Sequence, residues 1–133
     1  MAEKTIKTHK GGPVQGGERT AYIIDAADRS LGRVASEAAS ILLGKKSASY
    51  VQNEVLPMEV TIVNVSKLRM TEKRIAMKDY VRYTGYPGGL ITTSMQMMIE
   101  KKGVGEVLRK AVDGMIPRNK LRKERMKRLT IKD

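Results

Sequence analysis

The sequence predicts an α/β protein in which helices cover a small parallel sheet in a three-layer α/β/α arrangement. Two observations support this prediction. An apolar run, a helical pattern and a β-branched run follow one another in the order of a βαβ unit, whose crossover helix packs on the sheet. The chain has 133 residues, of which 41% are hydrophobic, and this is enough for one domain. We expect that domain at residues 21–133 and a flexible Gly-rich tail at residues 1–20.

The first strand and the first helix are predicted within residues 21–44. Residues 21–26 (AYIIDA) are a short apolar run of the kind found in buried strands. Ser30 suits the N-cap position of the helix that follows, and apolar residues then recur at helical spacing until Gly44 supplies a C-terminal stop. We therefore expect a helix over about residues 31–43.

The next apolar runs indicate further strands and a turn. Residues 59–65 (EVTIVNV) are β-branched and nearly continuously apolar, as in a strand covered on both faces. Residues 80–84 are a candidate for another strand. The GYPGGL sequence after them indicates a turn, because Pro87 lacks an amide donor and the paired Gly88 and Gly89 allow positive φ.

The last part of the chain is predicted to be helical. Residues 92–102 suggest a short helix. Residues 104–115 carry apolar side chains at i, i+3, i+4, i+7, i+8 and i+11, the clearest amphipathic pattern of the chain, which Pro117 should end. A basic C-terminal helix is expected over residues 118–128. Its apolar stripe is weak and consists of Leu121, Met126 and Leu129.

The charge balance predicts a polyanionic partner. The chain has 26 Lys and Arg against 14 Asp and Glu, a net charge of +12. Residues 66–133 contain 18 of these cations and seven of the acids, so nearly all the excess lies there. The absence of Cys excludes disulfides and thiol chemistry. No apolar run approaches the roughly 20 residues of a membrane span, so we expect a cytoplasmic protein without a membrane partner.

The densest group of cations lies in residues 118–128. Seven Lys or Arg with one Glu cannot all stand apart on one helix, and phosphates would relieve their repulsion. The alternative is a solvated basic face without a partner. The cations are Arg118, Lys120, Arg122, Lys123, Arg125, Lys127 and Arg128.

A second group mixes cations with aromatic rings between residues 67 and 89. Unpaired RNA bases stack on rings while cations hold the backbone, so this mixture suits looped RNA. Alternatively, Tyr80 and Tyr83 are core rings on a strand, and GYPGG is a plain tight turn. The loop matches neither common nucleotide-binding glycine motif. The candidate residues are Lys67, Arg69, Lys73, Arg74, Lys78, Arg82, Tyr83, Tyr86, Pro87, Gly88 and Gly89.

Three more candidate RNA-binding cations belong to the first helix and its end. Arg33 could meet phosphate at the N-terminus of the helix, or pair with Asp28 or Glu37 on the surface. Lys45 and Lys46 follow the helix directly.

The sequence gives little support for catalysis. The carboxylates show no metal-ligand or acid/base spacing, and Asp25 and Asp28 are better placed to cap or turn the chain. The single histidine, His9, lies in the predicted tail, where nothing would orient it. We therefore expect no catalytic residues, metal, cofactor or small-molecule substrate.

Five ordered blocks resemble the bacterial form of large-subunit ribosomal protein thirteen, over about residues 21–131. They are YIIDA at 22–26, LGRVAS at 31–36, VTIVNVSKL at 60–68, VRYTGYPGGL at 81–90, and VLRKAVDGMIPRNKL through KRL at 107–129. The resemblance implies a four-stranded parallel sheet in an α/β/α core. It also implies binding to large-subunit ribosomal RNA and a role in subunit assembly beside neighbouring ribosomal proteins.

The resemblance also points to particular RNA-facing residues. In the fourth block they are Arg82, Tyr86, Pro87, Gly88 and Gly89. In the last block they are Arg118, Asn119, Lys120, Lys127 and Arg128. Tyr83 stands where the family often has His. Two other classes remain open, namely a free regulatory or chromatin-type nucleic-acid-binding protein and, less supported, an enzyme of nucleotide metabolism.

Overall fold

The computed structural model describes residues 20–133. The predicted tail, with His9, therefore lies outside the described residues, apart from Thr20, which begins the first strand. The strands are β1 (Thr20–Asp25), β2 (Met58–Val63), β3 (Asp79–Tyr83), β4 (Leu90–Ser94) and β5 (Leu129–Ile131). The helices are α1 (Leu31–Leu42), α2 (Glu72–Met77), α3 (Met95–Lys102), α4 (Val104–Met115) and α5 (Leu121–Lys127), with a 3-10 turn at Val65–Lys67.

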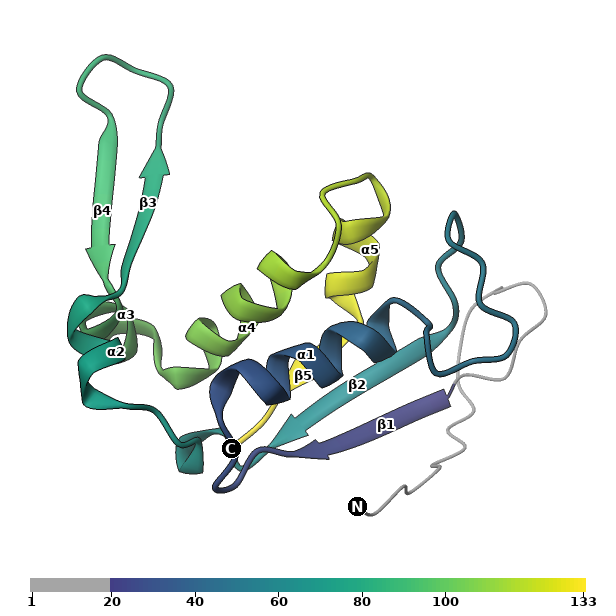
Figure 1. Cartoon of the computed structure of the whole chain (residues 1–133). Helices are drawn as coiled ribbons and strands as arrows, with labels where there is room; N and C mark the ends of the chain where they lie inside the picture. The colour runs from purple at the N-terminus through teal and green to yellow at the C-terminus, as the bar shows by residue number, and fades with distance from the viewer. Residues whose placement is uncertain (1–19) are drawn as a thin grey trace.

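Three parallel strands form the main sheet in the order β1, β2, β5 (Figure 1). The central position of β2 agrees with its apolar, β-branched sequence, MEVTIV. β1 pairs with it from Thr20 opposite Met58 to Asp25 opposite Val63, and α1 connects the two strands. The predicted βαβ unit is confirmed.

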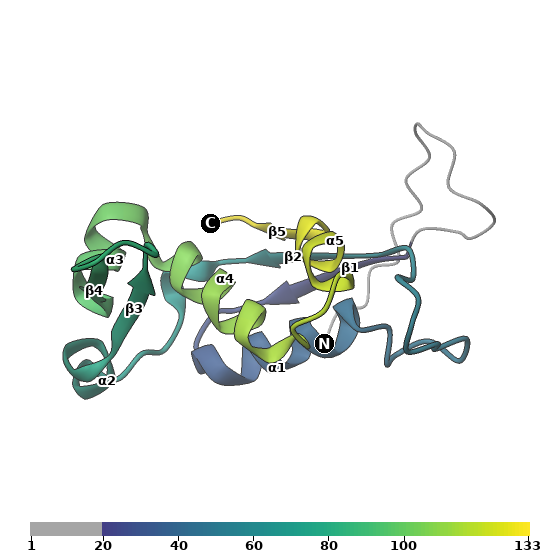
Figure 2. The same cartoon turned by 90° about the horizontal axis from the view of Figure 1, so that it is seen from above.

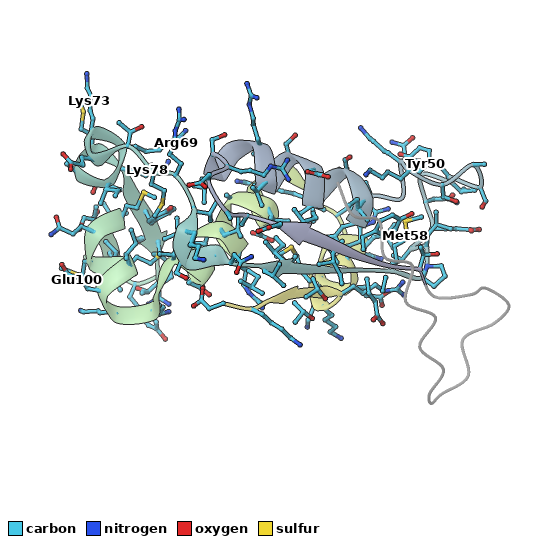
Figure 3. All side chains as sticks on the ribbon, turned by 90° about the horizontal axis from the view of Figure 1, so that it is seen from below. Tyr50, Met58, Arg69, Lys73, Lys78 and Glu100 are labelled. Carbon is cyan, nitrogen blue, oxygen red and sulfur yellow. The ribbon has the colours of Figure 1, made fainter. Side chains whose placement is uncertain are left out.

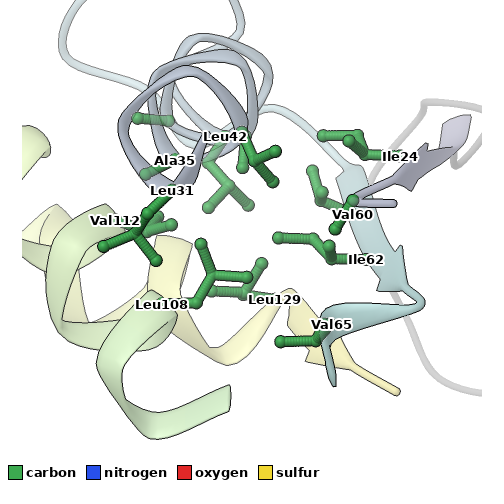
Figure 4. Packing of buried hydrophobic residues seen from close by; sticks show 14 of the residues in the cluster. Ile24, Leu31, Ala35, Leu42, Val60, Ile62, Val65, Leu108, Val112 and Leu129 are labelled. Carbon is green, nitrogen blue, oxygen red and sulfur yellow. The ribbon is translucent and has the colours of Figure 1, made fainter. Parts of the chain in front are cut away.

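Helices α1 and α4 lie side by side on one face of the sheet and enclose the core (Figure 2). Ala35 and Ala38 of α1 are completely buried, and their small side chains let α4 approach closely. Leu108 of α4 lies beside Leu129 and Ile62 (Figure 4). The core is thus aliphatic and rests on the two helices with the longest apolar stripes.

The α/β class is confirmed, whereas two details of the sheet differ from the prediction. Among residues 20–133 the parallel sheet has three strands instead of about four, because the candidate strand at 80–84 pairs in a separate antiparallel hairpin. Within the same residues, both core helices cover one face, and Ile23 and Thr130 on the opposite face are exposed. β2 accordingly alternates between buried and half-buried positions. The described chain has two layers where three were expected.

The helix predictions succeed where the apolar stripe is long. The helices expected over 31–43 and 104–115 are confirmed as α1 and α4. The helix expected over 92–102 starts late, because its first residues belong to β4. Ser94 then caps α3, accepting a 3.3 Å hydrogen bond from the amide of Met97.

The C-terminal helix is shorter than the predicted span of residues 118–128. α5 occupies seven residues and is followed by β5, which the sequence did not indicate. β5 pairs with β2 from Leu129 opposite Val60 to Ile131 opposite Ile62. Short α2 was also not predicted.

The hairpin of β3 and β4 projects away from the sheet, with α2 and α3 at its base (Figure 1). The amide of Met95 donates a 2.8 Å hydrogen bond to the carbonyl of Lys78, which ties the start of α3 to the residue before β3. A two-stranded hairpin alone is only marginally stable in water. The two helices at its base therefore supply the support that the strands lack.

Candidate nucleic-acid interface

The C-terminal basic segment, residues 118–128, separates its arginines from its lysines. Three arginines spaced three residues apart bond to other parts of the protein, and we call them the inner arginines: Arg122, Arg125 and Arg128. The remaining four cations are exposed and take part in none of the ion pairs found within residues 20–133. We call them the outer cations: Arg118, Lys120, Lys123 and Lys127.

Arg122 joins α5 to α4. Its Nε donates to Oδ1 of Asp113 at 2.6 Å, and its Nη2 contacts Oδ2 of the same carboxylate. These side-chain hydrogen bonds raise the pKa of the Arg122 guanidinium. The charge of Arg122 is thereby balanced within the protein, which leaves less of it for a phosphate than the sequence analysis expected.

Arg125 corrects the predicted RNA-binding set most clearly. It is only 2% exposed, and its Nη2 donates to the carbonyl oxygens of Gln52 at 3.4 Å and Glu54 at 3.1 Å. A phosphate on the surface cannot reach a guanidinium held in this way. Leu121 and Leu129 lie four positions on either side of Arg125, so the apolar stripe of the helix predicted over residues 118–128 and continued to Leu129 passes through it, although Leu129 belongs to β5 in the structure. That spacing was the signal that could have identified it as an inward-facing residue.

Arg128 is half-buried, and its Nη1 donates to the carbonyl of Leu56. Together with Arg125 it fastens the segment 44–57, which connects α1 to β2, against the end of α5. Charge-assisted hydrogen bonds to carbonyls are stronger than neutral ones. The inner arginines therefore connect α5 and the residue after it to α4 and to segment 44–57, while the outer cations remain exposed.

A basic depression of about 420 Å³ lies between α4 and α5. Since Asp113 neutralises Arg122 there, three cations face the depression without a carboxylate partner in the described residues. Phosphate groups spaced along a nucleic-acid backbone suit such a row of cations. The three cations are Arg109, Lys123 and Lys127.

The hairpin exposes apolar side chains on one face. The strand register places Val81, Tyr83 and Leu90 on the same side, and their exposed fractions are 64%, 62% and 63%. Arg82, the only cation of β3, lies on the opposite face beside Ile91. Soluble proteins seldom leave a contiguous apolar patch uncovered. The hairpin therefore has the surface of an element that contacts a partner.

The three tyrosines near the hairpin differ in their surroundings. Tyr80 packs against the core, with the ammonium groups of Lys78 and Lys110 at 5.6 Å and 5.4 Å from its ring centroid. Burial raises the pKa of Tyr80. Tyr83 and Tyr86 are 62% and 76% exposed. The alternative interpretation, in which both Tyr80 and Tyr83 are core rings on a strand, is therefore confirmed for Tyr80 and wrong for Tyr83.

The glycines at the hairpin tip are required by the turn itself. The amide of Gly89 donates to the carbonyl of Tyr86 at 2.9 Å, and the amide of Thr84 donates to the carbonyl of Gly89 at 3.0 Å. Gly88 has the expected positive φ of 73°. Gly89 does not, but a Cβ there would collide with the side chain of Thr84. The predicted turn is confirmed, and the turn alone explains both glycines.

The cations between β2 and β3 are all exposed. They belong to the 3-10 turn, the segment after it, α2 and the residue that follows α2. The side chains of Arg69 and Lys73 extend to the same side of the molecule (Figure 3). Lys78 differs, because its ammonium lies over the ring of Tyr80. The exposed cations are Lys67, Arg69, Lys73, Arg74 and Lys78.

The cations of the first helix are only partly as expected. Arg33 is exposed, but the pairing considered for it belongs to Arg29, whose Nη2 lies 2.6 Å from Oε2 of Glu37. Lys46 lies 4.0 Å from Oε1 of the same carboxylate, and Lys45 is exposed. Arg33 and Lys45 are therefore more available to a partner than Lys46.

Asp25 turns the chain after β1, as predicted. Its Oδ1 accepts hydrogen bonds from the amide of Ala27 at 3.0 Å and from Nδ2 of Asn64 at 2.9 Å, and these bonds lower the pKa of Asp25. Within residues 20–133 no group of three or more His, Cys, Asp or Glu could hold a metal ion. No helix in that range is long and apolar enough to cross a membrane.

Segment 44–57 contributes to the surface beside α5, and no pattern in the sequence indicates this. A second depression, of about 640 Å³, is lined by Gln52 and Asn53 from this segment and by residues 119–121. Neither charge nor periodicity marks these amides in the sequence. Contacts from Arg125 and Arg128, far away along the chain, bring them next to α5.

A small α/β domain with a row of exposed cations and a projecting apolar hairpin defines the class of basic domains that bind an extended polyanion. The chain belongs to the family described as ribosomal protein L13, whose sequence model matches residues 19–132. The resemblance seen in the five sequence blocks is confirmed.

Curated relatives support this assignment. The large ribosomal subunit protein uL13 of Geobacter sulfurreducens is 39% identical over 126 residues, which cover 95% of this chain and 87% of the relative. The protein of the same name from Pelobacter propionicus is 40% identical over 114 residues, covering 86% of this chain and 80% of the relative. That of Borrelia hermsii is also 40% identical, covering 86% and 76%.

Proposed function

We propose that this chain is a structural constituent of the large ribosomal subunit, working in the cytoplasm without catalysing a reaction. It binds large-subunit ribosomal RNA and supports subunit assembly beside neighbouring ribosomal proteins. The observation that carries the proposal is the division of the C-terminal segment, where inner arginines bond to the protein and outer cations remain for phosphates. Family membership and the names of the relatives support it.

The proposed interface is the predicted residue set without Arg125. The α/β body acts as a rigid support, the outer cations neutralise phosphates, and Tyr83 and Tyr86 of the hairpin stack on unpaired bases. Arg122 and Arg128 contribute mainly by fixing α5, because their guanidinium groups already bond to Asp113 and Leu56.

Sucrose-gradient fractionation of a native lysate tests this function. Mass spectrometry of the fractions would locate the chain after washes at moderate and high salt. We expect it to stay with large subunits through the high-salt wash, because an interface that combines phosphate contacts with stacking is screened only in part. Its absence from ribosomal fractions at both salts would contradict the proposal and favour a free RNA-binding protein.

A further inference from the structure

The amide-lined depression between segment 44–57 and the turn before α5 has a composition that the phosphate contacts do not explain. Its volume is about 640 Å³, and its lining is Gln52, Asn53, Asn119, Lys120 and Leu121. Asn119 also borders the basic depression between α4 and α5, so the two sites adjoin. One depression offers cations for a backbone, and the other offers mainly amides.

Three side-chain amides suit the edge of a nucleobase better than a phosphate. Each carboxamide presents a donor and an acceptor side by side, the pattern with which Asn and Gln pair with base edges. The half-buried Leu121 supplies an apolar surface for the flat base, and Lys120 can reach the phosphate of the same nucleotide. Lys120 is the single cation of this lining, whereas three of the five lining residues carry a carboxamide.

Both walls of the depression are fixed by contacts within the protein. On one wall, buried Arg125 donates to the carbonyl of Gln52 at 3.4 Å. On the other, the amide of Asn119 donates to the carbonyl of Pro117 at 2.9 Å, and the amide of Arg122 donates to the carbonyl of Asn119 at 3.2 Å. A site held in this way loses little conformational entropy when a ligand binds.

The start and end of segment 44–57 also pack together. Gly44 has a φ of 85°, and a Cβ built on it would lie 2.7 Å from Cδ1 of Leu56. The amide of Met58 donates to the carbonyl of Leu56 at 2.8 Å. The segment is therefore closed at its base, which limits how far Gln52 and Asn53 can move.

We propose that this depression binds one unpaired nucleotide of RNA, whose base edge is bonded by Asn53 and Asn119 from opposite walls. This inference rests on the proposed function and deepens it, because it assigns base recognition to side-chain amides that lie beside the outer cation Lys120. We expect an unpaired nucleotide, since the Watson–Crick edge of a paired base is occupied and the major groove of an RNA helix is too deep and narrow for side chains to read.

The test compares the full-length protein with the double variant Asn53→Ala/Asn119→Ala. The probe is protein-free large-subunit ribosomal RNA, with binding measured from 50 to 200 mM salt and chemical reactivity mapped at each nucleotide. We expect roughly five- to 100-fold weaker binding, an unchanged salt slope because no cation is removed, and loss of protection at one unpaired base. Gln96→Ala, an exposed amide on α3, is the matched control and should bind like the wild type.

Two results would overturn the inference. Wild-type affinity and protections in the double variant would show that no base occupies the site. Weaker binding with every base protection unchanged would indicate that the amides contact a phosphate or a sugar instead. The proposed function fails separately, if the wild-type protein binds this RNA no better than an unrelated RNA of equal length.

Discussion

The hairpin and the C-terminal segment both belong to the proposed interface, yet they are built in opposite ways. The C-terminal segment keeps four cations exposed over arginines that bond to the body. The hairpin, residues 79–94, carries one cation, Arg82, and one acid, Asp79, and instead exposes rings and aliphatic side chains. One region offers charge and the other offers apolar surface.

Because of this difference, the two regions should respond differently to salt. Contacts between cations and phosphates release counterions, so their contribution falls steeply as salt rises. Stacking and apolar burial involve no charge and depend on salt far less. The hairpin should therefore retain the RNA under conditions that weaken the C-terminal segment.

The largest effect is expected from the exposed tyrosines of the hairpin. Tyr83→Ala/Tyr86→Ala should weaken binding to protein-free ribosomal RNA by about 2–6 kcal/mol, because each base stacked on a ring contributes about 1–3 kcal/mol. The salt slope should stay the same. Tyr83→Phe/Tyr86→Phe keeps the rings and serves as the control in the same titration. Undiminished binding by the alanine pair would show that the hairpin contacts something other than RNA.

The outer cations should show the complementary behaviour. Lys123→Ala/Lys127→Ala should reduce the salt slope by about 1.8, so that the affinity lost between 50 and 200 mM salt shrinks about tenfold. Lys101→Ala/Lys102→Ala removes the same charge from exposed positions of α3 outside the proposed interface. Equal slopes for the two double variants would mean that only net charge matters and would remove the special role of α5.

Arg125 should contribute to the stability of the fold and to the order of segment 44–57, and not to phosphate binding. Arg125→Met keeps an apolar stem but loses the hydrogen bonds to Gln52 and Glu54, which should lower the free energy of unfolding by about 1–2 kcal/mol. Amide hydrogen exchange in segment 44–57 should become faster. Arg118→Met, at an exposed position, should change neither quantity, and urea unfolding with exchange mass spectrometry measures both. Unchanged exchange in the Arg125 variant would show that other contacts hold the segment.

The smallest effect is expected from Asp25, which is exposed. Because its pKa is lowered in the folded state by hydrogen bonds from Ala27 and Asn64, it adds stability above its unfolded pKa of about 4, and this is lost as pH falls through the lowered value. Asp25→Asn resembles the protonated carboxyl. Unfolding curves of the two proteins should therefore differ at pH 7 and converge near pH 2. A difference independent of pH would contradict this explanation.

Local sequence patterns could predict the core but not every strand. The stripes of α1 and α4 contain enough turns to define an inward face, and both helices were found. β5 has three residues, and its pairing with β2 depends on contacts nearly 70 positions away, at Val60 and Leu129. The candidate strand at 80–84 exists but pairs only with its own hairpin partner, which no residue pattern distinguishes from addition to the sheet.

The sequence predicted which cations the candidate site contains, but not which of their side chains point into the protein. Counting cations located the C-terminal segment, yet it treated Arg125 like Lys123, although the first is buried and the second exposed. Which side chain points inward depends on carbonyl groups supplied by segment 44–57, and those partners lie more than 70 residues away in sequence. The exposure of Tyr83 likewise depends on the hairpin standing apart from the sheet.

Lysine reactivity in intact large subunits would show whether the outer cations lie against the RNA. Purified subunits and the free protein would be acetylated under the same conditions, and mass spectrometry would compare each lysine. We expect Lys120, Lys123 and Lys127 to be protected in the subunit, because RNA phosphates cover them, while Lys101 and Lys102 stay comparatively reactive. Equal reactivity of the three α5-region lysines in both states would contradict the assignment of the outer cations to the RNA interface.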